Sequence, residues 1–136
     1  SHFSTFHRQA RAVVSACAAV ARRYVIERKN ILLEGIHMIP GFLSKELQGM
    51  DEAPIVVEFF VSLSDEDTHN ARLSHRLAAG PGRGGHRHLM RFDVIRELQN
   101  HMKSMARVAG IPEYDVGGSE DLTQRIVKGI VDRALE

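Results

Sequence analysis

Several arginines and one histidine recur at a spacing that would bring them to one face of a helix. His69, Arg72 and Arg76 stand at positions i, i+3 and i+7, which share one side of a helix. Arginine offers a rigid fork of N–H donors that matches the oxygens of a phosphate group. Three more arginines follow, within and just after a glycine-rich stretch that we expect to be a loop: Arg83, Arg87 and Arg91. This concentration favours a phosphoryl-transfer site covered by an arginine-bearing flap, and the alternative is a solvated helix face.

A second candidate for chemistry is the carboxylate of Glu34, which directly follows the apolar run Ile31–Leu33. A carboxylate at the end of a buried strand is costly unless it faces a ligand crevice or has a partner. In a crevice it could hold Mg²⁺ or accept a proton from an attacking hydroxyl group. Gly35 and His37 follow at once, which favours this interpretation over a structural ion pair or helix cap. For His37 a ligand contact and a packed loop position are equally supported.

These residues need a scaffold, and the apolar periodicity predicts alternating helices and strands. Short β-branched or continuous apolar runs predict strands at 31–33, 55–61 and 113–116. Helical patterns cover 9–28, 43–47, 65–77 and 88–109, with a last helix capped by Asp121 and Gln124. Ser64 with Asp67 resembles a capping box for the third of these helices.

This order indicates an α/β fold, a parallel sheet flanked by helices, built as one domain over residues 1–136. Ligands of such sheets bind beyond the carboxyl ends of the strands. The rule selects the segments 34–37, 62–65 and 115–118, which contain or adjoin the candidate residues.

Composition and missing motifs exclude several classes of protein. A formal net charge of +1 argues against a dedicated nucleic-acid binder, and the apolar runs are too short for a membrane span. With Cys17 as its single cysteine the chain has no internal disulfide, so we expect a cytoplasmic protein. The spaced glycines of 80–85 follow a helix instead of a strand, so they do not indicate a dinucleotide site. His86 and His88 lack acidic or cysteine partners at zinc-ligand spacing.

Three segments together resemble the 2-phosphoglycerate kinase family of P-loop kinases. They are Asn30–Gly41, Asp65–His69 with Arg72 and Arg76 after it, and Phe92–Arg96. With the helix that contains Gln9, the resemblance covers nearly the whole chain. It implies transfer of the γ-phosphate of ATP, with Mg²⁺, to 2-phosphoglycerate to give 2,3-bisphosphoglycerate.

The resemblance also implies roles for individual residues. Glu34 matches the acidic residue that ends the Walker B-type strand, near metal and acceptor, and Gly35 and His37 match the acceptor-side segment. Arg72 and Arg76 match the helix that leads into the lid, whose candidate arginines are Arg83, Arg87 and Arg91. Gly117 and Gly118 match the segment that passes the adenine of the nucleotide.

The chain departs from this family pattern because it has no glycine-rich phosphate loop with its Gly-Lys-Ser/Thr ending. In the family fold the strand before that loop lies between the strands expected at 31–33 and 55–61. We therefore expect the C-terminal part of a P-loop kinase domain that lacks the first strand and is inactive alone, the missing part lying in cis or in another chain. The alternative is a degenerate kinase relative that binds phosphorylated metabolites such as inositol phosphates. A nucleic-acid module is a weaker reading because aromatic residues for stacking are few.

Overall fold

A two-stranded parallel sheet joins the two halves of the chain in the computed structural model, which describes residues 2–79, 91–118 and 121–136. Strand β1 (Phe60–Ser62) pairs with β2 (Glu113–Asp115), with Val61 opposite Tyr114. The ladder continues at both ends through the Phe60 N–H to Pro112 O bond and the Val116 N–H to Ser62 O bond, at 2.9 and 2.8 Å. The expected parallel α/β pattern is confirmed for this pair of strands.

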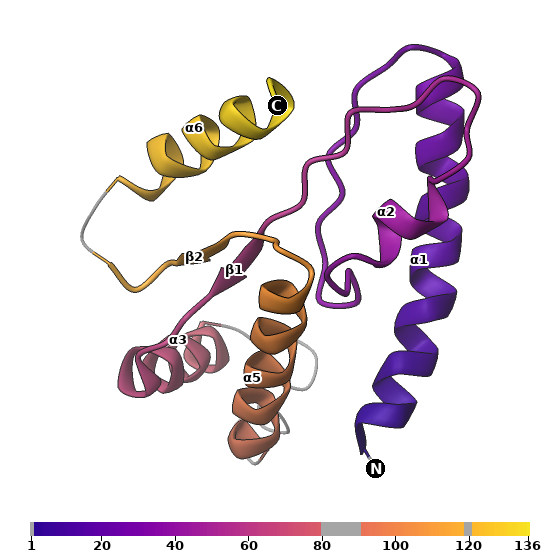
Figure 1. The fold of residues 1–136 in the computed structure, drawn as a ribbon. Helices are drawn as coiled ribbons and strands as arrows, with labels where there is room; N and C mark the ends of the chain where they lie inside the picture. Colours follow the sequence, from indigo (N-terminus) through magenta and orange to yellow (C-terminus); the bar gives the residue numbers. More distant parts are fainter. Residues whose placement is uncertain (1, 80–90, 119–120) are drawn as a thin grey trace.

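Helices α3 (Glu66–Ala78) and α5 (Phe92–Val108) follow β1 and precede β2, which gives the long connection that parallel strands require. Both lie on one side of the strands, and α6 (Leu122–Ala134) lies on the other side (Figure 1). The cap of α6 is confirmed, since Asp121 accepts a hydrogen bond from the N–H of Gln124 at 3.2 Å. The cap of α3 is Asp65 and not Ser64, because the Asp65 carboxylate accepts from the N–H of Thr68 at 2.8 Å.

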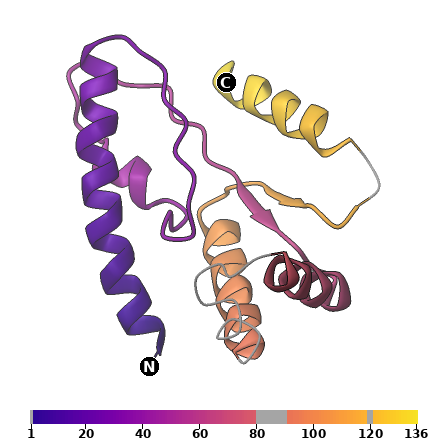
Figure 2. The same cartoon turned by 180° about the vertical axis from the view of Figure 1, so that it is seen from behind.

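The N-terminal half is built on α1 (His2–Ile26), which stands beside the short helix α2 (Phe42–Glu46), as the two opposite views show (Figures 1 and 2). Buried small side chains at helical spacing (Ala10, Val14, Ala18 and Ala21) make one face of α1. The core forms where α1 meets α5, around Ala10, Ile39 and Met102. Among the described ranges no helix is long and apolar enough to cross a membrane.

The strand expected at 31–33 is wrong, because these residues form an unpaired, extended connection between α1 and α2. The strand expected at 55–61 is also too long, since pairing begins at Phe60. Within the described ranges residues 31–33 and 55–59 have no neighbouring strand, and Leu32 and Ile55 remain 79% and 76% exposed. A strand requires a hydrogen-bonding partner, which a local apolar pattern does not supply.

One acidic residue inside the unpaired segment has a structural role that the sequence interpretation missed. The carboxylate of Glu58 accepts the backbone N–H groups of Gly41 and Ser44, at 2.7 and 3.1 Å, and also the Ser44 hydroxyl. Gly41 has a left-handed conformation with φ of 82°, which favours glycine. Glu58 therefore caps the start of α2, and an isolated acid in an apolar run was the available signal.

Candidate functional site

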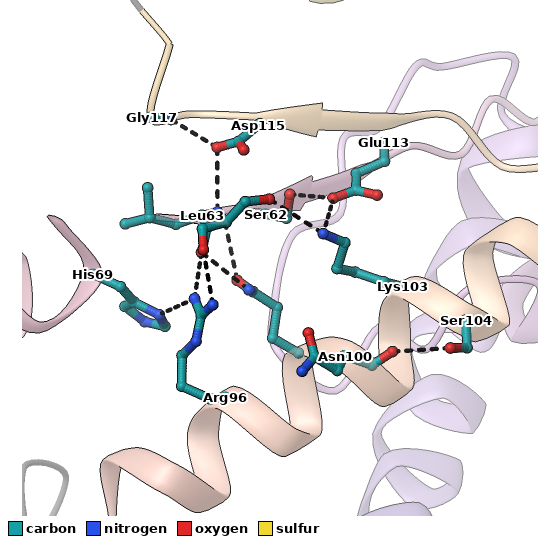
Figure 3. Close-up of polar contacts among 12 residues, drawn as sticks. Ser62, Leu63, His69, Arg96, Asn100, Lys103, Ser104, Glu113, Asp115 and Gly117 are labelled. Carbon is teal, nitrogen blue, oxygen red and sulfur yellow. Dashed lines mark hydrogen bonds and ion pairs between the residues drawn. The ribbon is translucent and has the colours of Figure 1, made fainter. Parts of the chain in front are cut away.

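The candidate site begins at the carboxyl end of β1, where two side chains of α5 hold the chain as it leaves the strand. Arg96 donates to the carbonyl oxygens of Leu63 and Ser64 at 2.7 and 2.8 Å (Figure 3). Gln99 accepts from the N–H of Leu63 and donates to its carbonyl, both at 3.0 Å. The backbone that leads into α3 is therefore fixed from α5.

The end of β2 is tied to the same segment. Asp115 Oδ1 accepts the N–H groups of Gly117 and Ser64, at 2.9 and 3.4 Å. These bonds, that from Gly117 first, hold the pKa of the Asp115 carboxyl below its usual range. Lys103 of α5 adds an ion pair to Glu113 at 3.0 Å and donates to the Ser64 hydroxyl at 3.2 Å. The two strand ends, α3 and α5 thus form one polar network.

A hollow of about 210 Å³ opens at this network, between the strand ends and α3. Helix α3 contributes His69, Arg72 and Arg76 to its lining, the three residues whose spacing predicted a common helix face. Arg72 donates to the carbonyl of Val116 at 3.2 Å, which joins α3 to the end of β2. Among the described residues no carboxylate forms an ion pair with Arg72 or Arg76, so the hollow is suited to an anion.

His69 is less exposed than Arg72 and Arg76. Its Nδ1 lies 3.3 Å from Arg96 Nη1, and its ring meets Phe92 edge-on with 5.1 Å between centroids. Burial lowers the pKa of His69, and the positive charges of Arg96, Arg72 and Arg76 lower it further.

The other predicted arginines do not extend this wall within the described residues. Arg91 is exposed at the N-cap of α5, makes no side-chain capping bond there and does not line the hollow. Arg83 and Arg87 lie outside the described residues, as does the glycine-rich stretch after position 79.

The structure does not bring the second predicted group, Glu34 to His37, to the hollow. Glu34 and Gly35 are exposed in the connection between α1 and α2. The ring of His37 stacks on Phe6 of α1, with 5.4 Å between centroids and 20° between planes. For His37 this contact favours the packed loop position over a ligand contact.

Gly117 and Gly118 follow the strand end beside the hollow. A Cβ at position 117 would lie 3.0 Å from the Leu63 side chain and 3.2 Å from Asp115 Oδ1, so a side chain there would crowd the network. A Cβ at position 118 would meet no atom within 4 Å among the described residues. Position 117 therefore favours glycine, because the Leu63 and Asp115 side chains lie close to it, whereas position 118 has room for a side chain.

The sequence interpretation assigned no role to Arg96 or Gln99, although a signal was present. Arg96, Gln99 and Lys103 recur at i, i+3 and i+7 on α5, the same spacing that identified the residues on α3. The sequence thus showed a second polar stripe, and the structure shows that it meets the first where Arg96 contacts His69.

The predicted site residues supply one of the groups that a nucleotide-bound metal ion needs, a carboxylate, but no cluster of metal ligands among the described residues. Among the described residues no group of three or more His, Cys, Asp or Glu side chains is gathered to hold a metal ion. Mg²⁺ bound to a nucleotide needs one or two carboxylates beside the phosphates, and Glu34 offers one exposed carboxylate.

A larger hollow, about 420 Å³, lies at the other end of the N-terminal half, between the end of α1 and residues 49–52. Its one arginine, Arg28, is paired with Glu52 at 3.2 Å, and Asp51 adds a second carboxylate to the lining, so this hollow does not suit an anion. Size alone therefore does not mark it as the site of chemistry.

Comparison with known proteins finds relatives that share one name. The chain is 31% identical to a 2-phosphoglycerate kinase of Methanothermobacter thermautotrophicus over 120 residues, 82% of this chain and 38% of that protein. It is 24% identical over 135 residues to the enzyme of that name from Methanococcus vannielii, covering 99% of this chain and 42% of the relative. The counterpart from Pyrococcus furiosus is 27% identical over 131 residues, 96% of this chain and 41% of the relative.

The resemblance to 2-phosphoglycerate kinases is therefore confirmed over most of the chain, which spans about two fifths of the length of these relatives. All three relatives carry the name of a kinase. No family model matches the chain. No solved structure matches it either.

Proposed function

We propose that this chain is part of an ATP-dependent kinase that phosphorylates a small acceptor already carrying a phosphate group, converting 2-phosphoglycerate to 2,3-bisphosphoglycerate. The observation that carries the proposal is the hollow walled by His69, Arg72 and Arg76 at the ends of two parallel strands. The two arginines of this hollow suit an anion, and the chain is similar to kinases named for a phosphorylated substrate.

In this proposal Arg72 and Arg76 bind the phosphate of the acceptor, as their guanidinium donors suit its oxygens. Arg91, with Arg83 and Arg87 outside the described residues, serves the lid that neutralises developing charge. Bound Mg²⁺–ATP supplies the phosphoryl group that is transferred. Gly35 and His37 belong to the acceptor side, and Gly117 and Gly118 to the adenine side.

Glu34 has two proposed tasks. It holds the metal, or it accepts the proton of the acceptor hydroxyl. Its exposure leaves the carboxylate available for either. Since Glu34 does not line the hollow in this chain, both tasks require the segment 31–37 to be placed by further structure.

We also propose that a strand and a phosphate-binding loop outside these 136 residues complete a P-loop kinase domain, in cis or from another chain. The exposed apolar residues of the unpaired segments, Leu32, Ile36 and Ile55, support this idea, because a strand between them would cover and pair both. The chain alone would lack the backbone N–H groups that hold the β- and γ-phosphates, so it should not turn over.

The test is the acceptor kinetics of the complete protein with ATP and 2-phosphoglycerate. Arg72→Ala and Arg76→Ala should each raise the KM for the acceptor about tenfold or more, the usual loss for a hydrogen bond to a charged group. Arg107→Ala, an exposed arginine of α5 that does not line the hollow, is the matched control. Unchanged KM values in both variants would show that these arginines form a solvated helix face and do not bind the acceptor.

The second candidate is a binding module for phosphorylated metabolites such as inositol phosphates. The hollow favours it equally, because His69, Arg72 and Arg76 need no nucleotide to hold a phosphate. A complete protein with no Gly-x-x-x-x-Gly-Lys-Ser/Thr segment, no ATP turnover and calorimetric binding of inositol phosphate would establish this candidate in place of the kinase.

A further inference from the structure

The hydrogen bond between Arg96 and His69 determines which nitrogen of the imidazole carries the proton. A guanidinium group only donates, so the His69 Nδ1 that lies 3.3 Å from Arg96 Nη1 must accept. A neutral imidazole that accepts at Nδ1 carries its proton on Nε2. Arg96 therefore leaves His69 with Nε2–H as its ring donor.

Arg96 is itself fixed, which makes this assignment a property of the fold. Its two Nη atoms bond to the carbonyls of Leu63 and Ser64, at 2.7 and 2.8 Å (Figure 3). The ring of Phe92 also contacts the imidazole, with 74° between the two planes. The ring orientation is thus set by α5 and the strand end, and not by solvent.

The charges around His69 oppose a second proton on the ring. Arg96 faces it from α5, and Arg72 and Arg76 from α3. On the neighbouring strand the carboxylate of Asp115 is bonded to the N–H groups of Ser64 and Gly117. Burial and the positive charges of the three arginines keep the pKa of His69 below its ordinary value, so the ring stays neutral near pH 7.

We propose that His69 is a further phosphate-binding residue of the hollow, a neutral donor through Nε2–H beside Arg72 and Arg76, and that Arg96 is the positioning residue that fixes its tautomer. The ligand is a phosphate monoester dianion. The inference deepens the proposed function, since it concerns the same site. It does not depend on ATP turnover.

The test reads the tautomer directly, by ¹H–¹⁵N correlation of histidine side chains in the complete protein, with inorganic phosphate titrated in at constant ionic strength and no nucleotide present. His69 should show the Nε2–H tautomer before and after phosphate is added, and its Nε2 signal should shift saturably. His75, an exposed histidine of the same helix that does not line the hollow, is the internal control. An Nδ1–H tautomer, or equal shifts at His69 and His75, would overturn the proposal.

Two amide variants test whether His69 acts through its Nε2–H donor or only through packing. His69→Gln places an amide N–H near the position of Nε2, and His69→Asn places its amide near Nδ1. Phosphate affinity should stay within about threefold of wild type in His69→Gln and fall about tenfold in His69→Asn and in His69→Ala, as expected for one lost bond to a charged group. Wild-type affinity in all three would exclude His69 from binding.

Arg96→Lys tests the positioning residue without removing the support of the strand end, because Gln99 still holds Leu63. The ammonium group lacks the planar fork that reaches both carbonyls and the imidazole. We expect a mixture of His69 tautomers and a higher His69 pKa, with an unchanged fold. A pure Nε2–H signal in this variant would show that Arg96 does not set the tautomer. Failure of the kinase proposal would instead appear as a normal His69 result without phosphorylation of 2-phosphoglycerate.

Discussion

The strand-end region and the connection from residue 27 to residue 59 are built in opposite ways. At the strand end, Leu63 has its N–H and its carbonyl bonded by side chains of α5, and Ser64 is bonded from both α5 and β2. In the connection, long stretches have no strand partner among the described residues, and Leu32, Ile36 and Ile55 remain exposed. The strand-end region thus has hydrogen-bond partners from this chain, whereas the connection is held mainly at α2. A site assembled from both, as the kinase proposal requires, needs a further structural element to bring them together.

The largest expected effect tests whether the connection belongs to the site at all. Glu34→Gln in the complete protein should lower kcat at least about 100-fold, because removal of a proton-accepting or metal-holding carboxylate has effects of this size. Steady-state kinetics and a thermal melt would be measured together, the melt serving to show an intact fold. Normal turnover would exclude Glu34 from the site, which would then consist of the strand-end hollow.

A second change asks whether the exposed apolar residues of the connection are covered in the complete protein. Ile55→Asp should destabilise it by about 3 kcal/mol in urea unfolding, since a charge would then replace a buried side chain. Val108→Asp is the matched control, because Val108 is 90% exposed at the end of α5. Equal, small effects in both variants would mean that residues 55–59 face solvent in the complete protein too.

A third change weakens the region that is already complete. Gln99→Leu removes the acceptor of the Leu63 N–H and leaves that group unsatisfied beside a buried side chain. The expected loss is about 2 kcal/mol of unfolding free energy, as for a buried donor without a partner. Asn100→Leu, an exposed neighbour on α5, should change stability by less than about 0.5 kcal/mol.

The smallest effect concerns a histidine contact between α1 and α5. His7 Nε2 lies 2.9 Å from His101 Nε2, and burial, His101 and Arg11 lower the pKa of His7. The unfolded chain therefore binds the proton more readily, so this contribution is present above pH 6.5 and is lost as pH falls through the lowered pKa.

The melting temperature should accordingly drop by about 1–3 °C between pH 7.5 and pH 5.5 beyond the drop seen in His7→Gln. The effect is small because both rings are partly exposed and solvent screens the charges. His75→Gln provides the matched control on α3. Identical pH profiles for wild type and His7→Gln would show that the histidine pair does not contribute.

Most of the helices and the cap of α6 could be predicted from the sequence because their signals are local, whereas Glu58, which caps α2, lies 14 and 17 residues from its partners. The pattern from Gln9 onward, the short helix near Leu43 and the Asp121 cap all have their partners within a few residues. The shift of the α3 cap from Ser64 to Asp65 is a local error, since both residues are good caps.

The strands and the site could be predicted only in part, because they depend on distant partners. The apolar run at 31–33 has the composition of a strand, yet within the described ranges no strand lies beside it. His69, Arg72 and Arg76 were found because one helix carries all three. Glu34 was predicted beside that face but does not line the hollow, because the spacing of residues does not encode how distant segments pack.

The bonds at Leu63 have a consequence for how the molecule opens. Its carbonyl accepts from both Arg96 and Gln99, and its N–H is bonded as well, so exposing this segment to solvent requires α5 to leave the strand. Local fluctuations begin where such anchors are few. Amide hydrogen exchange should therefore be slowest around residues 60–64 and fastest in the extended parts of the connection. Limited proteolysis should cut that connection first, and the fragment that contains the strand-end hollow should stay intact longest.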